Sequence, residues 1–292
     1  MTAEKYQVFM TVVEQGNLTR AAELLGCTQS AVSHSIHALE EELGFTLLKR
    51  GRGGVRLTDE GERLIPAVRA YLSSGEQLQQ TAAAIRGLDS GTVRIGAFTS
   101  VAVHWLPGAL KAFQRDYPHV EFQLFNGDYH DVNQWLSDGS VDIGFVKMPC
   151  GLDCECIALM EDRLLAILPP DSRFAAYPRF PLSECATEPF ISLLQSSDHD
   201  ARSALEAAGV TPNVRFHTKD DYAILAMVEQ GLGMSIMPEL LLKGRSDNLL
   251  TLPLVPEAKR TIGLAIAAGN RAGPATRKFA EYVVNYVKQR KE

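Results

Sequence analysis

The first apolar positions along the chain follow the spacing of two short helices. A helix over 3–14 gathers its apolar side chains on one stripe, formed by Tyr6, Phe9, Met10 and Val13. Gly16 ends this helix, and Asn17 is a natural N-cap for a second one. Gly26 follows at the position where a left-handed residue commonly terminates a helix. The second helix is therefore expected to be short and to lead into a tight turn.

A third helix, predicted over 29–43, has two unlike faces. Thr28 is its expected N-cap and Gly44 its terminating residue. The apolar face carries Val32, Ile36, Leu39 and Leu43, and the opposite face carries Gln29, Ser30, Ser33, His34 and His37. Two helices joined by a short glycine-containing turn match the helix-turn-helix unit, whose second helix enters the major groove of DNA.

The short polar face of this helix suits hydrogen bonding to base edges. The expected DNA-reading residues are Thr28, Gln29, Ser30, Ser33, His34 and His37. A glutamine can pair with adenine, whereas serine discriminates less between bases. Phosphates would repel the acidic run at 40–42, so only the first half of the helix is expected deep in the groove. The alternative is an ordinary surface helix with a solvated polar face.

A basic stretch, LLKRGRGGVRLT, follows the third helix. Its two short apolar runs around a glycine-rich turn predict a β-hairpin. Beside a helix-turn-helix, such a hairpin is a wing that grips the phosphate backbone, and its candidate contacts are Arg50, Arg52 and Arg56. Without the preceding helices, the same stretch would be a common basic surface loop.

The run AAELLGCTQSAVSHSIHALEEELGFTLLKRGRGGVRLTDEG resembles the winged helix-turn-helix of LysR-type transcriptional regulators. The resemblance includes the paired alanines, the S-x-x-I-x-x-L-E-E-x-L-G run and the L-T-x-x-G that starts the next helix. Two positions depart from it, since many family members carry Pro in place of Ala31 and Arg in place of His34. A neutral His34 offers less contact to phosphate or guanine than an arginine.

A long helix is predicted over 58–89, with Thr58 as its N-cap. Apolar or small residues alternate at spacings of four and three, which is a heptad seam: Leu64, Val68, Tyr71, Gly75, Leu78, Ala82 and Ile85. At 1.5 Å per residue the helix would span roughly 45 Å. The resemblance implies that it pairs with its twin in a homodimer, and that tetramers also form. The alternative is a helix packed on its own downstream domain.

From Gly91 onward the pattern changes to alternating strands and helices. TVRIGAF, VEFQLF and VDIGFV are predicted strands, followed by RLLAILP, EPFISL, NVRFH, MSIMP and TIGLAIA, and a final amphipathic helix spans 274–290. This alternation is typical of a parallel α/β architecture. The resemblance implies two α/β subdomains similar to periplasmic solute-binding proteins, with crossings near 160–163 and 266–269.

The expected fold is an all-α winged helix-turn-helix, a linker helix and an α/β two-subdomain effector domain. The corresponding ranges are 1–58, 59–90 and 91–292, with subdomain I at 91–161 and 268–292 and subdomain II at 162–267. A cleft between two such subdomains is a common place for a small ligand. The expected effector-binding residues are Thr99, Ser100, Val101, Lys147, Ile191, Ser192, Thr218 and Gly233.

Thr99 and Ser100 are the first choices, because they follow a strand where a helix begins and would suit an anion or carboxylate. Each of these residues has an ordinary alternative role as a capping hydroxyl or a turn glycine. Lys147 would supply a positive charge, or would equally be a solvated surface lysine.

Composition and charge agree with a globular protein of the cytoplasm. Hydrophobic residues make up 46% of the 292 positions, and no apolar run approaches the roughly 18 residues of a membrane span. The N-terminus lacks the features of a secretory signal. The net charge of −6 argues against strong non-specific nucleic-acid binding, so a local basic patch would have to supply the DNA contacts.

The clustered cysteines Cys150, Cys154 and Cys156 suggest a second chemistry, either a soft-metal site or a reversible disulfide. Their spacings do not match the usual paired C-x-x-C pattern, which favours structural or incidental cysteines. No phosphate loop, nucleophile elbow or H-E-x-x-H motif is present, so neither an enzyme nor a cofactor or metal site is expected.

Together these features predict a ligand-responsive transcriptional regulator that is not an enzyme. Its expected partners are double-stranded DNA at an inverted repeat, a small-molecule effector, further copies of itself and RNA polymerase, with no membrane contact. The two alternatives are a cytoplasmic solute-binding protein and a thiol-based redox sensor that uses the three clustered cysteines.

Overall fold

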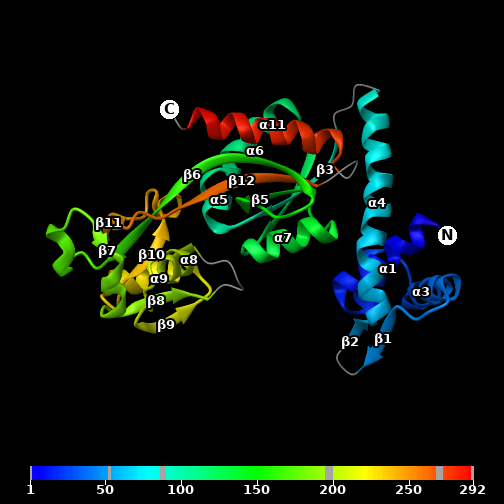
Figure 1. Cartoon of the computed structure of the whole chain (residues 1–292). Coiled ribbons are helices and arrows are strands. Elements are labelled where there is room, and N and C mark those ends of the chain that lie inside the picture. Colours follow the sequence, from blue (N-terminus) through cyan, green and yellow to red (C-terminus); the bar gives the residue numbers. More distant parts are fainter. Residues whose placement is uncertain (1, 52–53, 86–89, 195–199, 268–271, 291–292) are drawn as a thin grey trace.

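The computed structural model describes residues 2–51, 54–85, 90–194, 200–267 and 272–290 (Figure 1). In chain order it contains a small helical domain with a hairpin, a long helix and a larger mixed region of helices and sheet. Among the described helices, none is long and apolar enough to cross a membrane.

The small N-terminal domain has the predicted elements. They are α1 (Ala3–Gln15), α2 (Leu18–Leu24), α3 (Gln29–Leu43), β1 (Leu48–Gly51) and β2 (Gly54–Leu57). Their caps form as expected, because Asn17 accepts from the Thr19 amide at 2.8 Å and Thr28 accepts from the Ala31 amide at 3.2 Å. Gly26 has the left-handed φ of 64° that its turn requires. A single core of buried side chains, including Phe9, Val32 and Leu39, holds the three helices together.

The long helix α4 (Asp59–Ile85) begins at the predicted cap, where Thr58 Oγ1 accepts from the Gly61 amide at 2.9 Å. Of its predicted seam, Leu64 and Val68 pack into the N-terminal core. Beyond that point the seam is uncovered, with Tyr71, Leu78 and Ile85 exposed to 49%, 73% and 83%. The seam of α4 therefore has two parts, one that packs within the chain and one that faces solvent.

A different side of α4 lies against the larger region. Arg94 forms two hydrogen bonds of 2.9 Å with Glu76, and Arg69 Nη1 lies 2.7 Å from Asp138 Oδ1. Both expectations for this helix thus have a structural counterpart. The helix packs on its own downstream domain through polar pairs, and it also presents an uncovered apolar seam.

The larger region is built on an eight-stranded sheet and a separate pair of strands. The main sheet has the order β4-β3-β5-β12-β6-β11-β7, with β10 also paired to β6. Its strands are β3 (Ser90–Ala97), β4 (His119–Asn126), β5 (Ile143–Lys147), β6 (Cys154–Leu168), β7 (Phe180–Pro181), β10 (Ser235–Pro238), β11 (Leu250–Val255) and β12 (Lys259–Ala267). The separate pair is β8 (Phe190–Leu193) with β9 (Val214–Thr218).

Helices cover this framework on both subdomains. They are α5 (Thr99–His104), α6 (Leu106–Asp116), α7 (Tyr129–Asp138), α8 (Asp200–Ala207), α9 (Asp221–Glu229), α10 (Glu239–Leu242) and α11 (Pro274–Gln289), with short 3-10 turns at Arg173–Ala176 and Leu182–Ala186. One core, around Phe113, Phe145 and Phe279, fills subdomain I. Another, around Phe174 and Phe180, fills subdomain II. Two long strands, β6 and β12, run from one subdomain into the other (Figure 1).

The sheet differs from the parallel arrangement that the alternation predicted. The pairs β3–β4, β3–β5, β8–β9 and β11–β7 are parallel, whereas β12–β5, β12–β6, β10–β6 and β11–β6 are antiparallel. The antiparallel pairs arise because both crossing strands run the length of the region in opposite directions. The strand predicted from RLLAILP also begins earlier, at Cys154.

The two long strands pass from one core to the other, and on β6 Leu159 lies in the core of subdomain I and Leu164 in the core of subdomain II. Residues Ile262–Ile266 of β12 pair with β5 and belong to the core of subdomain I. The chain therefore crosses at the start of β12, near Lys259–Thr261, and not near 266–269, of which 268 and 269 lie outside the described residues. The apolar run TIGLAIA fills the first core, so it belongs to subdomain I and not to subdomain II.

Candidate functional site

The polar face of α3 is the first candidate site. Thr28, Gln29, Ser30, His34 and His37 are exposed, and Ser33 is half-buried. On the opposite face, Val32, Ile36 and Leu39 are buried in the domain core. The helix is thus held by one face and presents the other, as a helix that enters a DNA groove must.

The acidic end of α3 is largely occupied within the domain. Glu40 Oε1 accepts from the amides of Leu47 and Leu48 at 2.7 and 3.2 Å, which holds the chain entering β1. Glu42 accepts from Lys5, and this hydrogen bond lowers the pKa of the Glu42 carboxyl. Glu41 lies 3.4 Å from His37 Nε2. The repulsion of phosphates expected from the run 40–42 is therefore reduced at Glu42, where the Lys5 ammonium offsets the charge.

The predicted hairpin is present and is fixed to the helices. Its strands pair antiparallel, with Lys49 opposite Arg56, and both of these side chains are exposed. The Val55 amide donates to the Gly16 carbonyl at 2.9 Å. A Cβ on Gly54 would lie 2.5 Å from that carbonyl oxygen, so glycine is required there. The Arg50 side chain and all of Arg52 lie outside the described part of the chain.

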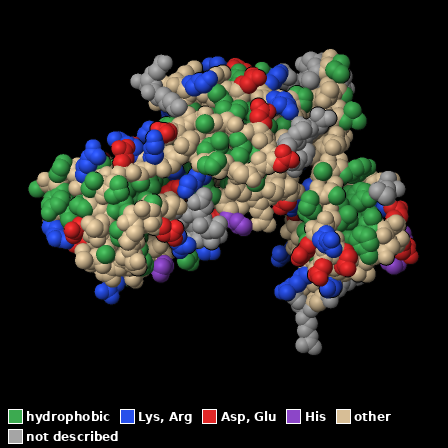
Figure 2. All heavy atoms as spheres, viewed as in Figure 1, with side chains coloured by type: hydrophobic (Ala, Val, Ile, Leu, Met, Phe, Trp, Pro, Cys, Tyr) green, Lys and Arg blue, Asp and Glu red, His purple; other side chains and the backbone are tan. Residues whose placement is uncertain are grey.

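Charged side chains of both signs share the visible surface of this domain. Figure 2 shows Lys and Arg side chains interspersed with Asp and Glu around the hairpin end. The negative net charge of −6 is therefore not segregated away from the helix-turn-helix. Among the described residues of the hairpin, the exposed cations Lys49 and Arg56 are available for contacts to phosphate.

The second candidate site is a cavity of about 570 Å³ between the two subdomains. Its lining includes Phe98, Thr99, Ser100, Asp128, Tyr129, Leu193, Asp200, Lys219, Asp221, Met237 and Arg260. Both subdomains thus contribute walls, from the start of α5 on one side to the starts of α8 and α9 on the other. Its size falls within the range of small-molecule sites.

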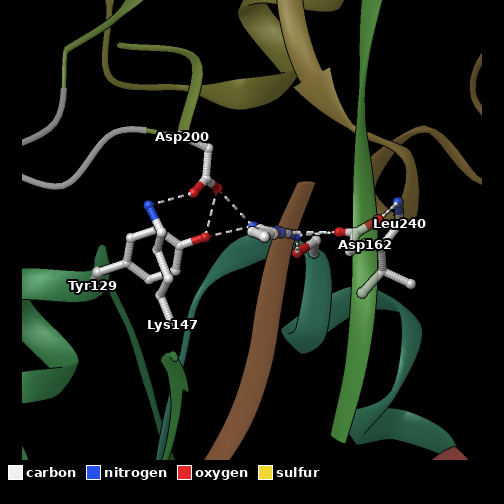
Figure 3. A network of polar contacts seen from close by, with 7 residues as sticks. Tyr129, Lys147, Asp162, Asp200 and Leu240 are labelled. Atoms are coloured by element: carbon white, nitrogen blue, oxygen red, sulfur yellow. Dashed lines mark hydrogen bonds and ion pairs between the residues drawn. The ribbon is translucent and has the colours of Figure 1, made fainter. Parts of the chain in front are cut away.

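Arg260, at the start of β12, is the centre of the polar groups in this cavity (Figure 3). Its guanidinium donates to Asp162 Oδ2 at 2.7 and 2.9 Å, and to Ser100 Oγ at 2.8 Å. It also donates to the Tyr129 hydroxyl at 2.7 Å, and it lies over the Phe98 ring. Asp162 in turn accepts from the Leu240 amide at 2.9 Å. All of the guanidinium nitrogens therefore have partners.

A second carboxylate, Asp200, faces the same group (Figure 3). Its Oδ2 accepts from the Tyr129 hydroxyl at 2.7 Å and lies 3.3 Å from Arg260 Nη1, while its Oδ1 lies 3.1 Å from Lys147 Nζ. Across the cavity, Asp221 accepts a hydrogen bond from Thr99. The two subdomains are thus joined by polar contacts at the cavity wall.

Burial shapes the protonation of these groups. It raises the pKa of Tyr129, and the negative charge of Asp200 adds to this effect, so the phenol stays protonated and donates. Burial alone would lower the pKa of Arg260, but the negative charges of Asp162 and Asp200 outweigh it and raise that pKa. Burial also raises the pKa of Asp162 and of Asp221.

The predicted effector residues are only partly brought together. Thr99 and Ser100 line the cavity, and Lys147 reaches its edge through Asp200. Val101 and Ile191 are fully buried in the two subdomain cores. The lining does not include Ser192, Thr218 or Gly233. Thr218 accepts from the Asp220 amide at 3.2 Å, and a Cβ on Gly233 would lie 2.5 Å from the Pro189 carbonyl oxygen, so both have local structural roles.

The central residues of the cavity, Arg260, Asp162, Tyr129 and Asp200, were not predicted. One signal was available, because Arg260 and Asp162 are charges that border apolar strands and therefore need partners. Their pairing depends on the register of two strands that lie far apart in sequence, and periodicity does not reveal register.

The clustered cysteines form a separate group that does not line the cavity. Cys150 and Cys156 are joined by a disulfide, and Cys154 Sγ lies 3.2 Å from Cys156 Sγ. Their three sulfur atoms lie within 4.8 Å of one another.

Comparisons with known proteins identify the family of both regions of the chain. Residues 3–62 match the family described as bacterial regulatory helix-turn-helix protein, lysR family, and residues 86–288 match the LysR substrate binding domain. The uncharacterized HTH-type transcriptional regulator YvbU of Bacillus subtilis (strain 168) is 31% identical over 284 residues, which cover 96% of this chain and 97% of that protein.

Two solved structures share the fold at lower identity. Full-length CbnR complexed with its target DNA has a TM-score of 0.68 at 22% identity, covering 98% of this chain and 100% of that one. The effector binding domain of QuiR in complex with shikimate has a TM-score of 0.61 at 21% identity, covering 68% of this chain and 98% of that one. The two family matches span nearly the whole sequence, and the protein therefore belongs to the LysR family as a DNA-binding transcriptional regulator with an effector-binding domain.

Proposed function

We propose that this regulator binds an inverted-repeat promoter site as a homo-oligomer and responds to a small molecule in its cavity. The observation that carries the proposal is the exposed polar face of α3 beside the fixed hairpin. Gln29, Ser30, Ser33 and His34 read base edges, with Thr28 and His37 flanking them, while Arg56 and the neighbouring arginines of the hairpin contact phosphates. Catalysis has no part in this function.

Oligomerisation is supported by the uncovered seam of α4. Tyr71, Leu78 and Ile85 recur every seven residues and remain exposed in the single chain. A second copy of the same helix would cover them, and a two-fold pair of recognition helices selects a two-fold DNA site. Tetramers and contact with RNA polymerase extend this proposal, and no residue is assigned to either.

Effector binding is supported by the cavity of about 570 Å³ and its charged lining. QuiR, which shares this fold, was solved with shikimate in its effector binding domain. In the present chain, a ligand that prefers one arrangement of the two subdomains shifts the population of arrangements. The shift changes how the oligomer presents its recognition helices.

Selection from random duplex DNA by the full-length protein tests the DNA-binding proposal. The expected result is enrichment of an inverted repeat, to which Ser33→Glu binds at least about tenfold more weakly because a carboxylate enters a groove lined with acceptors. Ser33→Ala is the matched control and keeps most of the affinity. The proposal is contradicted if the selection recovers no common sequence. It is also contradicted if Ser33→Glu and Ser33→Ala bind the selected DNA with equal affinity.

A further inference from the structure

Three donors from subdomain I converge on one carboxylate of subdomain II. Tyr129 lies on α7, Lys147 ends β5, and Arg260 opens β12. Tyr129 and Lys147 point to Asp200, the first residue of α8, which lies 2.7 Å from the hydroxyl and 3.1 Å from the ammonium (Figure 3). Arg260 Nη1 lies 3.3 Å from the same carboxylate. The two oxygens are divided between them, with Oδ1 facing Lys147 and Oδ2 facing the other two.

The charges of this cluster show what Asp200 contributes. Arg260 is already matched by Asp162, which accepts two of its hydrogen bonds. Asp200 forms an ion pair with Lys147, and the Asp200 and Arg260 side chains are exposed to only 10% and 5%. Without Asp200, Lys147 would lose this ion pair and the Tyr129 hydroxyl would lose its carboxylate acceptor, which is costly in a partly desolvated site.

Asp200 and two of its donors also line the cavity. The carboxylate, the Tyr129 hydroxyl and Arg260 form part of the wall, with Thr99 and Ser100 beside them. A ligand in this cavity thus lies next to the same donors that hold Asp200. An external carboxylate offers the same two oxygens and the same charge as the side chain that is already there.

We propose that Tyr129, Lys147 and Arg260 form the anchoring subsite for a carboxylate effector, and that Asp200 occupies this subsite as an internal competitor. This inference rests on the proposed effector function of the cavity and names the chemical class of the effector. The contact with Asp200 holds the two subdomains together at this wall. A carboxylate ligand displaces Asp200, takes over its three donors and releases α8 from subdomain I.

An internal competitor lowers the apparent affinity of the site for outside ligands, because the site is open for only a fraction of the time. Removing the competitor should therefore create affinity for the simplest carboxylate. The test measures acetate binding to the full-length protein by thermal shift and calorimetry, with chloride at equal ionic strength as the reference. Asp200→Ala is expected to bind acetate at least about tenfold more tightly than the unchanged protein.

Matched variants separate this inference from a general effect of lost charge. Asp221→Ala removes another cavity-lining acid of subdomain II, one that feels the charge of Arg260 but does not occupy the proposed subsite, and should gain far less acetate affinity than Asp200→Ala. Adding Lys147→Ala to Asp200→Ala should abolish the gain. Asp200→Asn, which keeps the shape of the side chain, should gain acetate affinity in the same direction and serves if Asp200→Ala does not fold.

Several outcomes would overturn the inference. One is that Asp200→Ala and the unchanged protein bind acetate with equal affinity. Another is that Asp221→Ala gains as much acetate affinity as Asp200→Ala. A third is that Asp200→Ala binds sulfate more tightly than acetate. DNA affinity is measured separately on the same proteins. If the acetate affinities contradict the carboxylate subsite, the proposal that α3 recognises DNA is not affected. If the protein does not bind DNA specifically, the acetate affinities still test the carboxylate subsite.

Discussion

Arg260 and Asp162 lie opposite each other on the two strands that cross between the subdomains. They are register partners in the β12–β6 pairing, their side chains are exposed to 5% and 2%, and Arg260 Nη2 lies 2.7 Å from Asp162 Oδ2. The ion pair therefore sits at the crossing itself, directly beside the cavity.

Breaking this pair on one side is expected to destabilise the fold. Arg260→Met leaves a buried carboxylate without its partner, and such a loss costs about 3–5 kcal/mol. The free energy of unfolding, measured with urea, should fall by this amount. Lys259→Met is the control, because its ion pair with Glu161 is exposed and screened by solvent, so its loss should change the free energy of unfolding little. If both variants lose the same free energy of unfolding, burial of the Arg260–Asp162 pair does not explain its contribution to stability.

Arg56 is expected to contact phosphate and not bases. Arg56→Ala should weaken binding to all duplex sequences by a similar factor and reduce the slope of log affinity against log salt by about 1. Fluorescence anisotropy over a salt series measures both quantities. Lys111→Ala, an exposed cation on α6, should leave the slope unchanged. A loss confined to the preferred sequence would instead make Arg56 a base-reading residue.

The uncovered part of the α4 seam is expected to hold two copies together. Leu78→Glu places a charge among Tyr71 and Ile85, and should shift the protein toward monomer in sedimentation velocity at micromolar concentration. Gln79→Glu adds the same charge at the neighbouring exposed position, off the seam, and should leave the assembly unchanged. If Leu78→Glu keeps its oligomeric state, another surface holds the subunits.

Asp221 gives a pH-dependent prediction. Burial raises its pKa in the folded protein above the unfolded value, so the folded state binds a proton more readily. Its contribution to stability is present below the unfolded pKa and is lost as pH rises through the folded pKa. Asp221→Asn, which can still accept from Thr99, should therefore raise the melting temperature at pH about 7 and have no such effect near pH about 3.5. A stabilisation that is the same at both values would contradict the assignment.

The N-terminal domain could be predicted from sequence almost residue by residue, because its signals are local. The helix expected over 29–43 is observed as Gln29–Leu43, and the caps Asn17, Thr28 and Thr58 all accept the expected amides. A cap and the glycine after it act within one turn of chain. No distant contact is needed to specify them.

The larger region was predictable as strands and helices but not in its pairing. Thr99 and Ser100, expected from the rule that ligands bind where a strand ends and a helix begins, do line the cavity, and their role in binding stays a prediction. Arg260, Asp162 and Asp200 come from three separate parts of the chain, and they meet only through the register of β6 with β12 and the placement of α8. The same register moved the second crossing to the start of β12, which local apolar patterns do not reveal.

The ion pairs Glu76–Arg94 and Arg69–Asp138 tie α4 to subdomain I at two points along its length. α4 also shares a hydrophobic core with the N-terminal helices. Subdomain I is therefore joined through α4 to the DNA-reading domain. Among the residues that the structure describes, the two ion pairs of α4 both go to subdomain I and not to subdomain II. Under the proposed function, a movement of subdomain II on its two crossing strands would therefore have to reach the DNA-reading end through subdomain I or through a second subunit.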